Sequence, residues 1–188
     1  MTDDSARGVT SVVSTVLLVA VVVVVAATLS VFVLDFGDDV ETAAPVVSQS
    51  SGELRADITG DDDQIVRLTH QAGDTLRVAD LQIAVDARTA CGKAGRLVNL
   101  PAPGGDPQPT ATYVEGDDIF DNSANSVSGP IGEDGRPVDG TWSAGETATF
   151  RIANGACSLD PGDPVTVRVV HTPSEAILIE KRLTASAS

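Results

Sequence analysis

Basic residues are scarce in this chain of 188 residues. It has 12 lysine and arginine residues against 27 aspartate and glutamate residues, for a formal net charge of −15. Lys93 and Lys181 are its two lysines, and the other basic side chains are arginines. Because binding of a phosphate backbone requires clustered lysine and arginine, this balance excludes nucleic acid as a partner.

Motifs for catalysis and ligand binding are also missing. The chain has no nucleophile elbow, no glycine-rich phosphate loop and no Cys-x-x-Cys pair. His70 and His171 end strand-like runs and are interpreted as strand-edge residues, and Ser174 beside His171 makes no triad. Acidic residues at 61–63 and 115–118 lack the EF-hand spacing, so solvated carboxylates are the stronger interpretation. We therefore expect no enzyme, cofactor or metal site.

One stretch, residues 9–34, contains no charge, glycine or proline. Twelve of its 26 residues are valine. As a helix it would be about 39 Å long, more than the roughly 30 Å of a bilayer's hydrocarbon core. A helix satisfies its own backbone hydrogen bonds in lipid, whereas a lone strand does not. The sequence therefore predicts a transmembrane helix over residues 9–36, with Arg7 before it and Gly37 after it.

Two interpretations of this helix are possible. A secretory signal peptide has an apolar core of about 7 to 15 residues before a small-residue cleavage site, but here the apolar run continues past Ala26-Ala27 to Leu34. The alternative places processing in the polar tail 1–8, so that the helix stays with the mature protein. Arg7 precedes the helix, and the next basic residue is Arg55. The tail is therefore expected in the cytoplasm and the large domain outside.

The two cysteines, Cys91 and Cys157, would then lie in an oxidising space, where they can form one disulfide bond. Two buried free thiols are the alternative. A zinc site has less support, because the chain has no paired cysteines and its histidines are scattered.

The short charged leader ending in Arg7-Gly8, followed directly by the apolar run from Val9, resembles the archaeal type IV pilins with their class III signal peptides. The resemblance implies cleavage between Gly8 and Val9 by a membrane-embedded prepilin peptidase. It also implies that the helices pack into the core of a filament. Thr10-Ser11 stands where family members often have Ser-Pro. The aspartate-rich, lysine-poor composition is similarly like that of haloarchaeal proteins.

Small residues lie four positions apart on the expected helix, in the pairs Ser11 with Thr15 and Ala26 with Ser30. Such pairs let neighbouring helices approach closely, although the spacing could also be incidental in a helix surrounded by lipid.

The resemblance implies a structural subunit of a pilus-like filament, assembled from copies of this chain or with co-pilins. Its precursor would be inserted in the membrane with the N-terminus in the cytoplasm, and the mature protein would lie on the cell surface. A hypothesis from a different class is a non-polymerising, signal-anchored surface protein whose head binds a partner.

The remainder of the chain has the pattern of a β-domain. Residues 37–52 are small and polar with Pro45 among them, which predicts a neck linker before a domain at 53–188. Runs with strand periodicity occur at 54–59, 65–70, 76–86, 148–153, 165–171 and 176–183. Short strands separated by Gly, Pro and Asp turns predict an antiparallel β-sandwich of Greek-key or immunoglobulin-like kind. The expected fold class is α+β.

Residues 92–140 interrupt this pattern with Gly, Pro, Asp, Asn and Ser. We interpret them as a long loop region with one short strand near 113–120. This region is the candidate surface for adhesion or subunit contact, with a solvent-facing variable loop as the alternative. The aromatic residues expected in the core or at its edge are Phe120, Trp142 and Phe150.

Overall fold

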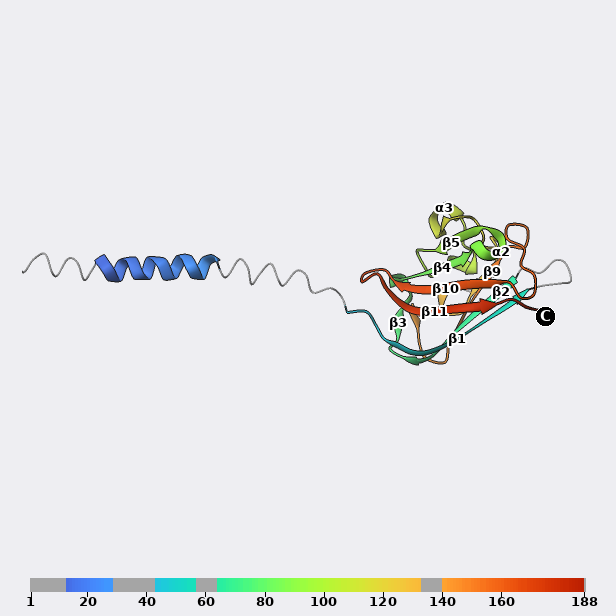
Figure 1. Ribbon diagram of the computed structural model, residues 1–188, viewed down its shortest axis with the longest axis horizontal. Coiled ribbons are helices and arrows are strands. Elements are labelled where there is room, and N and C mark those ends of the chain that lie inside the picture. Colours follow the sequence, from blue (N-terminus) through green and yellow to red (C-terminus); the bar gives the residue numbers. More distant parts are fainter. Residues whose placement is uncertain (1–12, 29–42, 57–63, 133–139, 188) are drawn as a thin grey trace, which may run out of the picture. The chain divides into compact units, whose positions relative to one another are not determined.

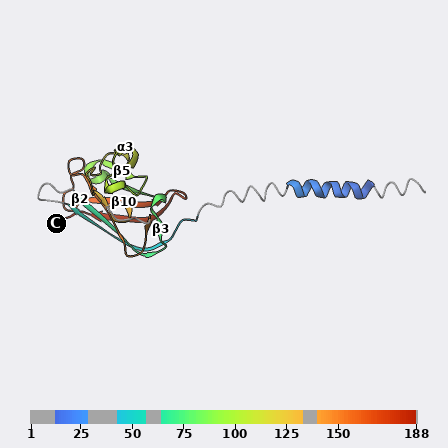
Figure 2. The same cartoon turned by 180° about the vertical axis from the view of Figure 1, so that it is seen from behind.

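The computed structural model describes residues 13–28, 43–56, 64–132 and 140–187. Its contacts divide the chain into two units, Met1–Glu41 and Thr42–Ser188. The first contains a helix and the second is rich in strands (Figures 1 and 2). The structure is therefore α+β, as the sequence predicts, with mostly antiparallel sheets in the second unit.

Residues 13–28 form one helix. No glycine or proline interrupts it, so its backbone hydrogen bonds continue unbroken. Near its end, the Thr28 hydroxyl donates a hydrogen bond to the carbonyl oxygen of Val25 at 2.9 Å. Among the described residues no helix is both long and apolar enough to cross a membrane. The ends of the helix predicted over 9–36 lie outside the described residues.

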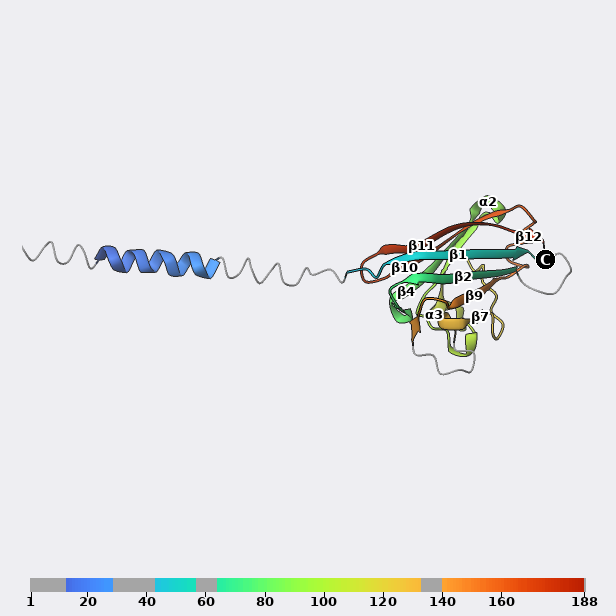
Figure 3. The ribbon, with the colours of Figure 1, turned by 90° about the horizontal axis from the view of Figure 1, so that it is seen from below.

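One five-stranded sheet of the second unit has the strand order β12-β1-β2-β9-β7. Its pairings are antiparallel except that of β1 with β12, which is parallel. Figure 3 shows β1 and β2 side by side. The strands are β1 Val47–Ala56, β2 Gln64–Gly73, β7 Val127–Ser128, β9 Thr147–Ile152 and β12 Ser186–Ala187.

A second five-stranded sheet is antiparallel throughout and has the order β11-β10-β4-β5-β6. Its strands are β4 Leu81–Ala87, β5 Lys93–Leu97, β6 Val114–Gly116, β10 Pro164–His171 and β11 Ala176–Thr184. A two-stranded sheet pairs β3 Leu76–Arg77 with β8 Thr141–Trp142. The short helices are α2 Arg88–Cys91, α3 Thr110–Tyr113, and the 3₁₀ turns η1 Val78–Asp80, η2 Pro103–Gly105 and η3 Gly129–Ile131.

Alternation of buried and less buried side chains explains the central strands. Strands β4 and β10 bury every second residue. The register places Val167 opposite Val85 and Val169 opposite Ile83, so that the buried side chains of the two strands share one face of the sheet. The predicted alternation in these two runs is confirmed.

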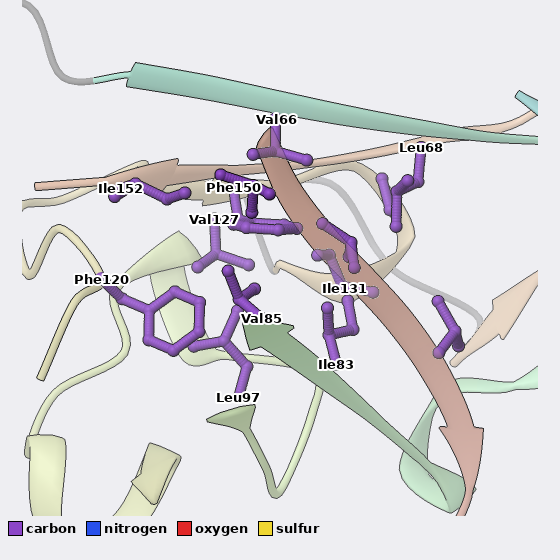
Figure 4. Close-up of a cluster of buried hydrophobic side chains, with 14 of the residues drawn as sticks. Val66, Leu68, Ile83, Val85, Leu97, Phe120, Val127, Ile131, Phe150 and Ile152 are labelled. Carbon is purple, nitrogen blue, oxygen red and sulfur yellow. The ribbon is translucent and has the colours of Figure 1, made fainter. Parts of the chain in front are cut away.

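Buried side chains of both five-stranded sheets form a single hydrophobic cluster. Figure 4 shows Val66 and Phe150 of one sheet pointing toward Val85 and Leu97 of the other. The ring of Phe120 meets that of Phe150 edge to face, with centroids 5.8 Å apart. Burial of an aromatic or branched side chain contributes about 1.5–3 kcal/mol, so this cluster is the main source of stability of the second unit.

Strand β1 begins at Val47, inside the segment predicted as a neck linker at 37–52. Within this strand only Leu54 and Ala56 are buried. The earlier residues are held by backbone pairing with β2 and have no buried face, so they show no alternation in the sequence. The start of a domain at residue 53, inferred from periodicity, therefore misses the first half of β1.

The segment 92–140 is more regular than the predicted long loop. It contains β5, β6 and β7, besides α3 and the turns η2 and η3. Strand β5 has a glycine, Gly95, at a buried position, so the sequence shows no apolar alternation there. A side chain is not tolerated at this position, because a Cβ atom would collide with the carbonyl oxygen of Asp117. The predicted strand at 76–86 is likewise divided, since η1 separates β3 from β4.

Candidate functional site: the apolar helix and the disulfide-bonded head

The helix at 13–28 exposes an uncharged, apolar surface. Ten of its valine and leucine side chains are 49–66% exposed. At about 100° per residue, Thr15 and Ala26 lie on the same side of the helix, with Val19 and Val22 between them. Their predicted partners Ser11 and Ser30 lie outside the described residues, as does the predicted processing site. Lipid or other apolar helices are the environments that suit such a surface.

Cys91 and Cys157 form a disulfide bond with a Cα–Cα distance of 5.5 Å. Cys91 ends α2, in the connection between β4 and β5, and Gly92 follows in the left-handed conformation with φ 80°. Cys157 lies after β9 and is part of the buried cluster. The bond therefore links the connection between β4 and β5 to the connection between β9 and β10, and the alternative of two free thiols is wrong.

A buried glutamine holds the chain next to Cys157. Gln64, at the start of β2, donates a hydrogen bond from Nε2 to the Cys157 carbonyl oxygen at 2.8 Å. Its Oε1 accepts one from the backbone N–H of Leu159 at 2.6 Å. Gln64 thus ties the segment that follows β9 to the start of β2, the strand that pairs with β9. Nothing in the sequence around this polar residue indicated that it is buried.

The two histidines have structural contacts. His70 is buried within β2, where Nε2 hydrogen-bonds with the Asp74 carbonyl oxygen at 2.8 Å and the ring meets Trp142 edge to face. It is therefore a core residue and not the predicted strand-edge residue. His171 does end β10, and its Nδ1 hydrogen-bonds with the Ser174 hydroxyl at 2.7 Å across the turn to β11.

Among the described residues, no group of three or more His, Cys, Asp or Glu side chains gathers to hold a metal ion. Residues 61–63 are outside that part of the chain. Of the other acidic stretch, Asp117 accepts a hydrogen bond from the backbone N–H of Ala94 at 2.8 Å, and Glu115 pairs with Arg96 at 3.7 Å. These two carboxylates connect β5 to β6 and the loop after it.

Arginines from α2, β5 and β10 lie near one another at the second sheet. Arg88, Arg96 and Arg168 line one shallow pocket of about 220 Å³. Arg168 Nε donates to Glu180 at 2.7 Å. This hydrogen bond and the charge of Glu180 raise the pKa of Arg168, with a smaller contribution from Asp86. The Arg168 guanidinium therefore remains charged.

The described part of the chain thus has a helix with an apolar exposed surface and, in residues 42–188, a strand-rich head with one disulfide bond. Residues 7–49 match the family model described as archaeal type IV pilin, N-terminal, and this similarity supports a pilin-like structural role. The resemblance inferred from Arg7-Gly8 and the following helix is thereby confirmed. The family is structural and non-enzymatic. No curated protein and no solved structure matches the chain.

Proposed function

We propose that this protein is a structural subunit of an archaeal type IV pilus-like surface filament, polymerising through its N-terminal helix. The observation that carries the proposal is the apolar surface of the helix at 13–28, within the segment 7–49 that matches the family. A helix without charged groups cannot remain in water alone. Copies of the same helix offer an apolar environment outside the membrane, and small residues such as Thr15 and Ala26 favour close packing.

Processing precedes assembly in this proposal. The precursor is inserted in the membrane with residues 1–8 in the cytoplasm. A prepilin peptidase cuts between Gly8 and Val9, and the mature protein assembles at the cell surface, alone or with co-pilins. The positive charge of Arg7 beside the helix supports this orientation.

The head, in the same proposal, is an outward-facing β-sandwich of Greek-key kind. The single cluster of buried side chains from both five-stranded sheets supports two packed layers. The pairing of β4 with β10, which are far apart in the sequence, supports a Greek-key connection. Adhesion or subunit contact is assigned to the exposed parts of residues 92–140.

Mass analysis of the N-terminus tests the proposal, using protein from material sheared off the cell surface. A mature chain that begins at Val9, in material that electron microscopy shows to be filamentous, is expected. A chain that begins at Met1, stays in the membrane fraction and never occurs in filaments would instead identify an anchored surface-binding protein.

A further inference from the structure

The outer side of the sheet β11-β10-β4-β5-β6 carries a row of charged side chains. The register places Arg168 opposite Glu180 on one side and opposite Ala84 on the other. Ala84 is in turn opposite Arg96, which is opposite Glu115. Opposed residues of antiparallel strands share a face, so five strands bring these side chains into one line.

Small residues between the arginines leave this face hollow. The pocket of about 220 Å³ has Ala84, Ala94, Gly95 and Gly116 in its lining. Next to it is a second pocket of about 200 Å³, which shares Glu115 and is lined also by polar side chains including Gln82, Asn99 and Thr172. Side chains of a partner therefore have room between the arginine stems.

The charge of this face differs from that of the chain as a whole. Arg88 pairs with Asp86 at 3.1 Å, Arg96 with Glu115 at 3.7 Å and Arg168 with Glu180 at 2.7 Å. Arg182, opposite the outward-facing Thr166, adds a fourth arginine. The face thus has four arginines and three carboxylates, whereas the whole chain has 12 basic and 27 acidic residues.

We propose that this face, defined by Arg88, Arg96, Arg168 and Arg182, binds carboxylate side chains on the head of a second copy of this chain. The inference rests on the proposed filament, in which heads are neighbours. A guanidinium has five N–H donors, so one ion pair leaves donors for a further carboxylate. Two heads, each with 21 acidic and 11 basic residues in 42–188 and a net charge of −10, repel each other in most orientations. An arginine face set against an acidic surface is the orientation that reduces this repulsion, and it fixes which sides of two heads meet.

Cross-linking in isolated filaments tests the contact. The variants Arg96→Lys and Arg168→Lys keep the charge and introduce an amine that a carbodiimide couples to a touching carboxylate. We expect covalent dimers on a denaturing gel, above the wild-type background from Lys93 and Lys181, and joined peptides from two subunits by mass spectrometry. The matched control is Arg67→Lys on the other sheet, where Arg67 is partly exposed and lies 3.9 Å from Glu53. It should give no dimers above background.

Charge reversal provides the second measurement. In the double variant Arg96→Glu with Arg168→Glu, the new carboxylates would face the carboxylates of the neighbouring head. This repulsion weakens the contact, so we expect filament number to fall by about tenfold or more. Arg67→Glu should leave filament number unchanged. An intact disulfide in the surface protein checks that the variants fold.

The outcomes separate the two proposals. Absence of wild-type filaments overturns the proposed function and this inference together. Wild-type filaments with cross-links only inside one subunit, or with equal dimer yield from Arg67→Lys, overturn the arginine face alone.

Discussion

Replacing both Cys91 and Cys157 with alanine should lower the free energy of unfolding of the head by about 4 kcal/mol. The bond closes a loop between residues 66 positions apart. In the chain-entropy model, removing that cross-link restores conformational freedom to the unfolded chain and leaves native contacts largely intact. Since domains are typically stable by about 5–15 kcal/mol, the variant keeps a folded head with a small remaining margin.

Urea unfolding of the full chain in detergent micelles measures this change. The single tryptophan, Trp142, is buried in the head, so its fluorescence reports on unfolding of this unit. The slope of the free energy against urea should rise in the variant, because an unlinked chain exposes more surface when unfolded. Reduced wild-type protein is the control, since it loses the bond but keeps both sulfur atoms. A loss below about 1 kcal/mol, in the variant and in the reduced protein alike, would refute the entropic argument.

Three further changes test other parts of the molecule. Val23→Asp should abolish filaments, seen by electron microscopy, more completely than it lowers membrane insertion on a blot, because a carboxylate costs roughly 3 kcal/mol in a bilayer and recurs in every subunit of a filament core. Gln64→Leu should destabilise the head by roughly 2–4 kcal/mol in urea unfolding, since it leaves a buried N–H and a buried carbonyl without partners. Gly105→Ala should lower the melting temperature more than Gly104→Ala. Both glycines have φ 64°, but only at Gly105 would the new Cβ collide with a backbone atom, the carbonyl oxygen of Val127; equal melting temperatures would contradict this.

The parts of the fold that the sequence predicts well are those with one buried and one exposed face. Val165, Val167 and Val169 alternate with polar or smaller side chains, and β10 follows that pattern. Prediction fails where burial does not alternate. The first half of β1 has no buried face, and β5 has a glycine at a buried position. Backbone pairing and close approach, which leave no period in the sequence, determine those elements.

The candidate sites also differ in how far the sequence alone predicts them. The apolar helix and the Arg7-Gly8 leader are local features, so the family was recognisable from a short stretch of sequence. Gln64 and the arginine face are not local. The burial of Gln64 is explained by its hydrogen bonds with the segment at 157–159. Arg96 and Arg168 line the same pocket because β4 alone separates β5 from β10. Strand order therefore has to be known before either can be inferred.

Apolar and charged residues occupy different parts of this chain. In the proposed filament the apolar helices pack in direct contact, whereas the charged heads repel each other over several ångströms. The helix has no charged group between residues 9 and 34, so its packing involves no charge repulsion that salt could screen. The head, residues 42–188, has 21 acidic and 11 basic residues and therefore a net charge of −10. Repulsion between heads extends over about 8 Å at physiological ionic strength and about 3 Å at 1 M. Pairs between Arg96 or Arg168 and a carboxylate in direct contact are shorter than either distance. High salt therefore weakens the general repulsion more than it weakens these contacts, and a strongly acidic head becomes compatible with close assembly around an apolar core.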